Sequence, residues 1–176
     1  MTEPIMVGMA EIKICTTPGG VLVALGLGSC IGVCAFDASA GVAGLAHIVL
    51  PNSGGQTITP GKFADTAIPL LFEKLQQEGA SPKRIRVALA GGAQLFNYNG
   101  TNTRLEIGAR NIEAVRAELH NRNARLIASD LGGNTGRTVH FYTTGKITVK
   151  SIGQGERELA NLAIPGLDFA SLRVAA

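Results

Sequence analysis

The sequence has few of the side chains that bind nucleic acid. It contains two tyrosines, six phenylalanines and no tryptophan, and only 16% of its residues are charged, with a formal net charge of +3. Nucleic-acid binding needs a basic surface, and binding of single strands adds aromatic stacking platforms. The one basic cluster, Lys83, Arg84 and Arg86, is typical of the solvated start of a strand. We therefore expect no nucleic-acid partner.

Cysteine is also scarce, and a long apolar run is missing. The three cysteines, Cys15, Cys30 and Cys34, cannot all pair, which is typical of a reducing compartment. Residues 1–10 lack the basic start and apolar core of a secretory signal. The most apolar stretch, residues 21–36, is shorter than the ~18 residues that span a membrane and is interrupted by glycines. These absences predict a cytoplasmic protein with no membrane insertion.

The residues that are abundant indicate a folded domain. Hydrophobic residues make up 45% of the chain and there are 23 glycines among 176 residues. This length supports one hydrophobic core and is too short for two ordinary domains. We expect a single domain over residues 1–176, with 155–176 as a less regular terminal segment.

Apolar patterning predicts strands at both ends of the chain and two helices between them. The first helix begins with Thr59 as N-cap and Pro60, ends at Gly79, and should be kinked or split by Pro69. The second helix covers 108–122, with Ile112, Val115 and Leu119 on its buried side. Strands are expected at 5–15, 21–27, 31–36, 42–50, 84–90, 125–129, 138–143 and 146–152. This order predicts an α+β or mixed α/β layered fold.

The segment Gly26-Leu-Gly-Ser-Cys-Ile-Gly32 places Cys30 in a glycine-rich bend, and His47 lies inside the next apolar run. The thiolate is the nucleophile, and a cysteine with a pKa of about 8.5 needs a positive neighbour to ionise near neutral pH. An imidazole supplies that charge and carries protons to the leaving group. If Cys30 and His47 meet, the pattern predicts hydrolysis at a carbonyl carbon through a thioester.

The glycines before Cys30 have two interpretations. A dinucleotide-binding loop requires a helix to begin at the glycines, whereas here a strand-like run follows, so we reject that interpretation. A sharp bend instead directs backbone N–H groups around Gly28, Ser29 and Cys30 at one point, as an oxyanion hole requires.

Other interpretations of the reactive residues remain open. Cys30 could be an inert buried thiol, and His47 could be a hydrogen-bonded core residue. Cys30 and Cys34 lack the additional cysteines or histidines of a zinc site, so no metal is expected. His120 ends the second helix, where it interacts favourably with the helix dipole, and His140 should face solvent.

Several motifs together resemble the CheD family of chemoreceptor glutamine deamidases over residues 5–155. The order and spacing of these motifs make the resemblance specific, although each one alone is weak. The matching segments are Leu25-Gly-Leu-Gly-Ser-Cys30, Ala46-His47 with Leu50-Pro51, Ser53-Gly54-Gly55, Gly61-Lys-Phe-Ala-Asp65, Ala90-Gly-Gly-Ala93 with Phe96, Ile107-Gly-Ala-Arg-Asn111, and Asp130-Leu-Gly-Gly133 with Gly136-Arg137.

The resemblance implies a cysteine hydrolase that converts glutamines of methyl-accepting chemotaxis receptors to glutamate and releases ammonia. Carried over by position, Cys30 is the nucleophile and His47 the general base, with no cofactor. The implied fold is a β-sandwich-like pair of sheets with two main helices, shared with toxin deamidases. A CheC-type phosphatase is the implied second partner. Most of the matching downstream glycine, asparagine and aspartate residues are expected to form turns.

The chain departs from the family pattern at one catalytic position. The family has a threonine six residues before the cysteine, which orients the imidazole, and this chain has Ala24 there. Another group must then orient His47: a backbone carbonyl, a water, or a hydroxyl such as that of Ser53. If none does, catalysis suffers. The alternative function is an adaptor that binds receptors or the phosphatase with weakened catalysis. Methylesterase activity on receptors is a further expectation.

Overall fold

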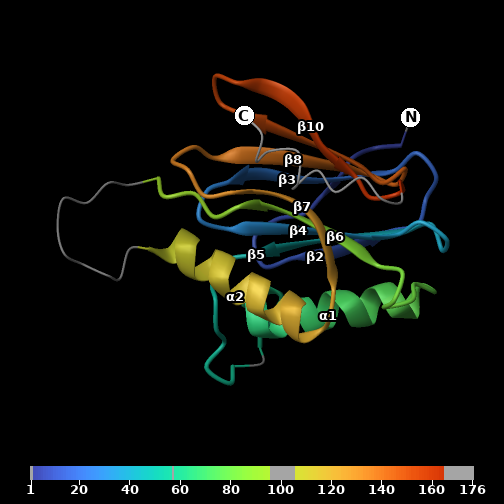
Figure 1. Cartoon of the computed structure of the whole chain (residues 1–176), viewed down its shortest axis with the longest axis horizontal. Coiled ribbons are helices and arrows are strands. Elements are labelled where there is room, and N and C mark those ends of the chain that lie inside the picture. The colour runs from blue at the N-terminus through green and yellow to red at the C-terminus, as the bar shows by residue number, and fades with distance from the viewer. Residues whose placement is uncertain (1, 57, 96–105, 165–176) are drawn as a thin grey trace.

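The computed structural model describes residues 2–56, 58–95 and 106–164, and these form three layers (Figure 1). The first sheet has the order β1 (Ile5–Met6), β3 (Val21–Leu27), β8 (Arg137–Tyr142), β9 (Lys146–Ser151), β10 (Gly155–Asn161). The second has the order β2 (Ile12–Cys15), β5 (Val42–Ile48), β4 (Ile31–Asp37), β6 (Arg86–Gly91), β7 (Arg125–Leu131). Helices α1 (Ala64–Gln77) and α2 (Ile107–Asn121) cover the outer face of this second sheet. The expected layered α+β fold, with sandwiched sheets and two helices, is confirmed.

The second sheet is buried on both faces, and this explains its nearly continuous apolar strands. Every residue of β4 and β5 is buried. Along β4, Cys34 and Phe36 pack against the first sheet, whereas Ile31 and Val33 pack against the helices. His47 therefore lies on a strand that is buried throughout, and Cys30 directly precedes another.

Helix α1 buries the apolar stripe that the sequence predicts, but it starts later and does not break. One turn of 3₁₀ helix covers Pro60–Lys62, Thr59 makes no side-chain cap bond, and α1 begins at Ala64. Pro69 lies inside the single helix. The expected N-cap is therefore wrong. The expected split is also wrong, because buried residues on both sides of Pro69, such as Ile68 and Leu71, pack on the sheet and keep the helix continuous.

The expected single strand over residues 5–15 is also wrong. Two short strands replace it, with β1 in the first sheet and β2 in the second. The chain crosses between the sheets at Val7–Glu11, where Ala10 has a φ of 66° and breaks the extended conformation. The crossing occurs beside β5: the Ala10 N–H donates to the His47 carbonyl, and the His47 N–H donates to the Glu11 carbonyl.

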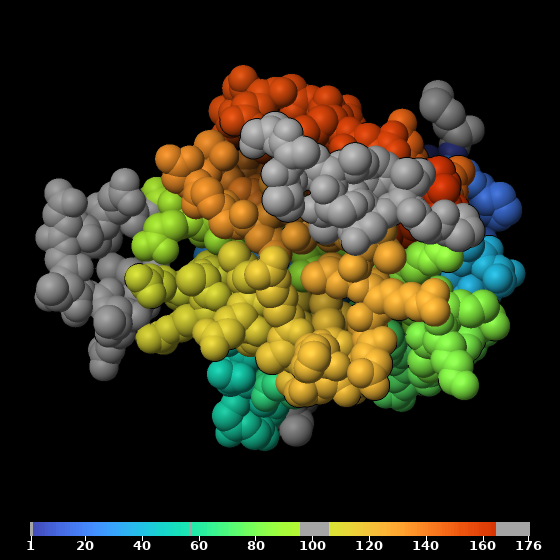
Figure 2. Space-filling model, in the orientation of Figure 1, coloured from blue at the N-terminus to red at the C-terminus, as the bar shows by residue number. Residues whose placement is uncertain are grey.

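The remaining expected strands are confirmed, with ends shifted by one or two residues. His140 alternates with buried Val139 and Phe141, so it points away from the core as expected. In the terminal segment, residues 155–161 form strand β10, and residues 165–176 lie outside the described residues. In the described ranges, no helix has the length and apolarity needed to cross a membrane. Figure 2 shows α2 and the chain after it across the centre of one face.

Candidate active site

Cys30 ends the turn between β3 and β4, and backbone contacts fix its position. Its side chain belongs to the core between the two sheets and the residue is 9% exposed. The Gly92 N–H donates to the Cys30 carbonyl at 2.9 Å. A Cβ at Gly91, where φ is +120°, would lie 2.0 Å from that carbonyl oxygen. Only glycine at position 91 permits this close approach.

His47 lies on β5 and faces the same side of the sheet as Cys30. The register pairs His47 with Gly32, two residues after Cys30. Side chains alternate along a strand, so Cys30 and Gly32 share a face, and Cys30 is the diagonal neighbour of His47. Gly32 has no side chain, and the Leu27 side chain packs against its Cα: a Cβ there would lie 3.0 Å from Leu27 Cδ1. The sequence alone does not establish that the two residues share a face.

The imidazole of His47 is oriented by a backbone carbonyl. Its Nδ1 lies 3.0 Å from the Val7 oxygen, and the residue is 5% exposed. A carbonyl oxygen only accepts hydrogen bonds, so Nδ1 carries a proton, and in the neutral form of the ring Nε2 is the atom with the lone pair. A neutral imidazole with a free Nε2 can act as a general base.

Neither Ala24, at the position of the family threonine, nor Ser53, the side chain expected to replace it, hydrogen-bonds to Nδ1. Ala24 is fully buried between the sheets and has only a methyl group. The Ser53 hydroxyl donates to Asp65 Oδ2 at 2.9 Å, and the Ser53 N–H donates to Asp65 Oδ1 at 2.9 Å. Ser53 therefore organises the loop before α1. Of the three kinds of group considered, the structure has the backbone carbonyl.

The turn also contains candidate oxyanion donors. The Cys30 N–H approaches its own sulfur. In the described part of the chain, neither the Ser29 nor the Cys30 N–H donates to a backbone carbonyl. The Gly28 carbonyl accepts from the Ala93 N–H and Leu95 packs against the Gly28 Cα, so the oxyanion role expected for the Gly28 N–H stays a prediction. The N–H groups of Ser29 and Cys30 are therefore candidate oxyanion donors.

Burial raises the pKa of the Cys30 thiol above its ordinary value, and the Cys30 N–H opposes part of that rise. This result differs from the preformed thiolate that the sequence analysis considered. A thiol with a raised pKa needs a base to remove its proton when it attacks. Cys34 is fully buried, and desolvation raises the pKa of its thiol far more. All three cysteines are free.

Asn111 contacts the turn that carries Cys30, a role that the sequence did not indicate. It lies on α2, is fully buried, and donates from Nδ2 to the carbonyls of Ser29 and Val49, both at 2.9 Å. These two bonds connect the residue before Cys30 to the end of the strand that carries His47. A buried asparagine on a predicted helix face was the only signal in the sequence, and the helix did not by itself identify the partners.

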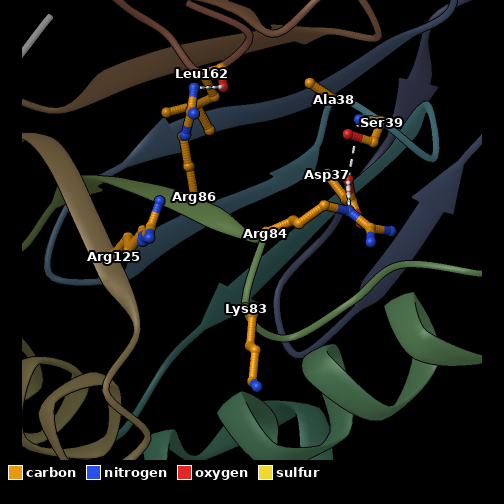
Figure 3. A pocket seen from close by; sticks show the side chains of 8 residues that line it. All are labelled: Asp37, Ala38, Ser39, Lys83, Arg84, Arg86, Arg125 and Leu162. Carbon is orange, nitrogen blue, oxygen red and sulfur yellow. Dashed lines mark hydrogen bonds and ion pairs between the residues drawn. The ribbon is translucent and has the colours of Figure 1, made fainter. Parts of the chain in front are cut away.

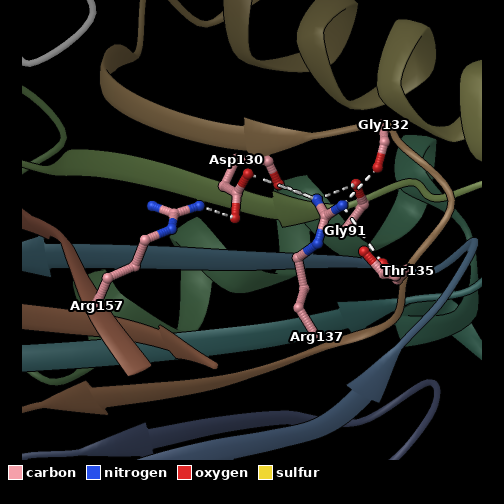
Figure 4. Close-up of polar contacts among 6 residues, drawn as sticks. All are labelled: Gly91, Asp130, Gly132, Thr135, Arg137 and Arg157. Carbon is pink, nitrogen blue, oxygen red and sulfur yellow. Dashed lines mark hydrogen bonds and ion pairs between the residues drawn. The ribbon is translucent and has the colours of Figure 1, made fainter. Parts of the chain in front are cut away.

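Arg137 fixes the strand ends beside Cys30 (Figure 4). Its buried guanidinium donates to the carbonyls of Gly91, at 3.1 Å, and of Asp130 and Gly132. It lies 3.9 Å from the Asp130 carboxylate, which also pairs with Arg157. Burial lowers the pKa of Arg137, and Asp130 opposes that change. Arg137 therefore holds Gly91, the residue against which the Cys30 carbonyl packs.

The fold and this pair of residues define a candidate cysteine hydrolase, and comparison with known proteins identifies the family. The family model described as CheD chemotactic sensory transduction matches residues 49–151, more than half of the chain. The chemoreceptor glutamine deamidase CheD of Thermotoga maritima is 45% identical over 153 residues, which cover 86% of this chain and 94% of that protein. The chemoreceptor glutamine deamidase CheD of Halalkalibacterium halodurans is 40% identical over 163 residues, which cover 90% of this chain and 100% of that protein. The chain belongs to the CheD family.

Proposed function

We propose that this protein deamidates glutamine side chains of methyl-accepting chemotaxis receptors through Cys30. The observation that carries the proposal is the His47 imidazole, which faces the same side of the sheet as Cys30 and is oriented by the Val7 carbonyl. The deamidase names of the relatives support the choice of substrate. A cytoplasmic, reducing location would keep the thiol free.

The reaction begins when His47 Nε2 takes the proton of Cys30 and the sulfur attacks the glutamine side-chain carbonyl carbon. The N–H groups of Ser29 and Cys30 stabilise the negative oxygen of the tetrahedral intermediate. Protonated His47 returns the proton to the leaving nitrogen, and ammonia departs. A thioester between the glutamyl carbonyl and Cys30 remains.

Hydrolysis completes the cycle. His47 removes a proton from water, the resulting hydroxide attacks the thioester carbonyl, and the sulfur leaves and regains a proton. The products are a glutamate side chain and free Cys30. The same groups would hydrolyse a glutamate methyl ester, whose methoxide leaves more readily than an amide nitrogen, so we propose receptor methylesterase activity as a side reaction.

A second function, an adaptor, is favoured by Ala24 alone. In that case the protein would bind receptors or a CheC-type phosphatase with little catalysis. We propose the phosphatase as a partner in either case, because the family resemblance implies it. The Val7 carbonyl makes the enzyme the stronger proposal, since it supplies the orientation that Ala24 cannot.

Ammonia release from purified receptor fragments tests the enzyme. The wild-type protein should release ammonia and add one negative charge per modified glutamine, whereas Cys30→Ala should release none. Cys15→Ala is the matched control, since it removes another buried thiol and should retain activity. Wild type that binds the fragments but releases no more ammonia than Cys30→Ala would establish the adaptor instead.

A further inference from the structure

A hollow of about 230 Å³ lies at the opposite end of the second sheet from Cys30. It is lined in part by Asp37, which ends β4, and by Arg86 and Arg125, which begin β6 and β7. Strand β4 starts directly after Cys30, and seven residues at ~3.3 Å each separate the two ends by roughly 20 Å. The hollow is therefore distinct from the candidate active site.

The register places two arginines side by side in this hollow. Arg86 and Arg125 are paired Cα partners of the parallel strands β6 and β7. Like charges in directly neighbouring positions destabilise a sheet. Among the residues that the structure describes, no carboxylate forms an ion pair with either arginine, and Arg86 donates only to the Leu162 carbonyl, at 3.2 Å. The positive charge of the pair has no protein counterion there.

The carboxylate of Asp37 does not neutralise Arg86 or Arg125, because it is bound to other groups. It accepts from Arg84 Nε at 3.1 Å, lies 2.9 Å from Arg84 Nη2, and also accepts the N–H groups of Ser39, Ala40 and Ser81. Figure 3 shows Arg84 turned toward Asp37, Arg125 beside Arg86, and Lys83 directed away toward the helices. The excess charge in the hollow therefore comes from Arg86 and Arg125.

We propose that this hollow binds a phosphate-class oxyanion between Arg86 and Arg125. Guanidinium groups present several N–H donors in a planar fork that matches phosphate oxygens. A dianion would also neutralise the cross-strand repulsion. Free phosphate and a phosphomonoester share this chemistry, and the experiment separates them.

Titration of the full chain with sodium phosphate tests the proposal, with ionic strength kept constant by sodium chloride. Backbone amide NMR signals of residues 38–39, 84–86 and 125 should shift and saturate below about 10 mM phosphate, the range of weak but specific ligands. Phosphate should also raise the melting temperature. Tighter binding of O-phosphoserine than of phosphate would identify a phosphomonoester site, and equal or weaker binding would identify a free-phosphate site.

Two variants and one control make the test specific. Arg125→Ala should weaken phosphate binding roughly tenfold or more, because charge-assisted bonds are lost. Arg125→Glu should abolish binding while raising the melting temperature without phosphate, since the introduced carboxylate could pair with Arg86. The control, Arg116→Ala with Lys150→Ala, removes two exposed charges elsewhere and should leave binding within twofold. Unsaturable shifts, equal shifts with acetate, or equal weakening in the control would overturn the proposal.

Discussion

At the scale of single residues, three backbone-directed contacts define the candidate active site. The Val7 carbonyl orients His47, the Gly92 N–H binds the Cys30 carbonyl, and Asn111 binds the carbonyl before Cys30. Side chains thus provide the nucleophile and the base, whereas the main chain provides most of their positions. The pKa of Cys30 and the two bonds of Asn111 lead to separate predictions.

We expect Cys30 to be alkylated slowly at neutral pH and faster as the pH rises. Burial raises the pKa of its thiol, so the thiolate fraction is still increasing above pH ~8.5, where an unperturbed cysteine is half ionised. Iodoacetamide labelling followed by mass spectrometry measures the rate at each pH. Cys34, fully buried, is the internal control and should stay unlabelled in the folded protein. A rate that is maximal and flat from pH 6 would show a preformed thiolate and contradict this expectation.

Asn111→Leu should reduce both stability and turnover. Leucine has a similar shape but cannot donate, so two buried carbonyls lose their partner at about 1–3 kcal/mol each. Asn111 Oδ1 has no partner among the described residues, so removing this oxygen does not lower the free energy of unfolding further. We expect kcat to fall at least tenfold with KM little changed, because the Cys30 turn moves relative to His47.

Arg116→Ala, on the exposed side of the same helix, is the control for Asn111 and should change neither quantity. The Cys30 labelling profile separates the two roles of Asn111. A variant with lower stability but with wild-type kcat and labelling would show that Asn111 only supports the fold.

At the scale of elements, Asp37 joins the β4–β5 turn to the segment before β6. Burial raises the pKa of its carboxyl, but the Arg84 guanidinium and the N–H groups of Ser81 and Ala40 outweigh burial and hold that pKa below its ordinary value. A lowered pKa in the folded state means that the charged form stabilises the fold. This contribution is fully present well above pH 3.8 and is lost as the pH falls through the folded pKa.

Asp37→Asn should therefore lower the melting temperature at neutral pH, by the equivalent of about 1–3 kcal/mol, because a charge-assisted contact is lost. The difference between wild type and variant should shrink as the pH is lowered below about 4, where the unfolded carboxyl becomes protonated. Thermal unfolding of both proteins from neutral pH to below pH ~4 measures this difference in stability. Glu3→Gln, at an exposed residue, is the control, and a difference that does not change with pH would contradict the assignment.

At the scale of the whole molecule, the crossing between the two sheets supplies a backbone partner to the candidate active site. The chain leaves β1 in the first sheet and enters β2 in the second, and on the way Val7 presents its carbonyl to His47. Ala24, on β3 of the first sheet, faces the same interior. The family resemblance implies an acceptor for the ring at position 24, and in this chain the Val7 carbonyl lies at Nδ1.

Removal of residues 1–7 should lower kcat by roughly 10²-fold, since loss of the group that orients the imidazole is costly in related triads. In this truncated protein, Ala24→Thr should recover at least tenfold, because a threonine hydroxyl can accept from Nδ1. In the full chain the same substitution should have little effect, since Nδ1 already has an acceptor. Ammonia release with receptor fragments measures each rate.

Ala24→Val is the matched control for this rescue, because valine has the shape of threonine without the hydroxyl. Equal recovery by valine would attribute the effect to packing. A full chain that Ala24→Thr activates strongly would show that the Val7 carbonyl is an insufficient partner for His47.

The sequence by itself determined most of the local elements and indicated the candidate reactive side chains. Apolar periodicity located strands β3 to β9 and both helices, and the glycine-rich bend identified Cys30, because these features depend on neighbouring residues. It missed the break after β1 and the continuity of α1 through Pro69, because distant packing overrides local preference at both places.

Only the tertiary structure decided which distant groups meet. The partner of His47 is a main-chain oxygen, and every residue has one, so no side-chain motif could identify Val7. The register that pairs His47 with Gly32 and Arg86 with Arg125 is set between strands far apart in sequence. The orientation of His47 and the positive charge of the hollow at Arg86 and Arg125 both follow from contacts between segments that are far apart in sequence.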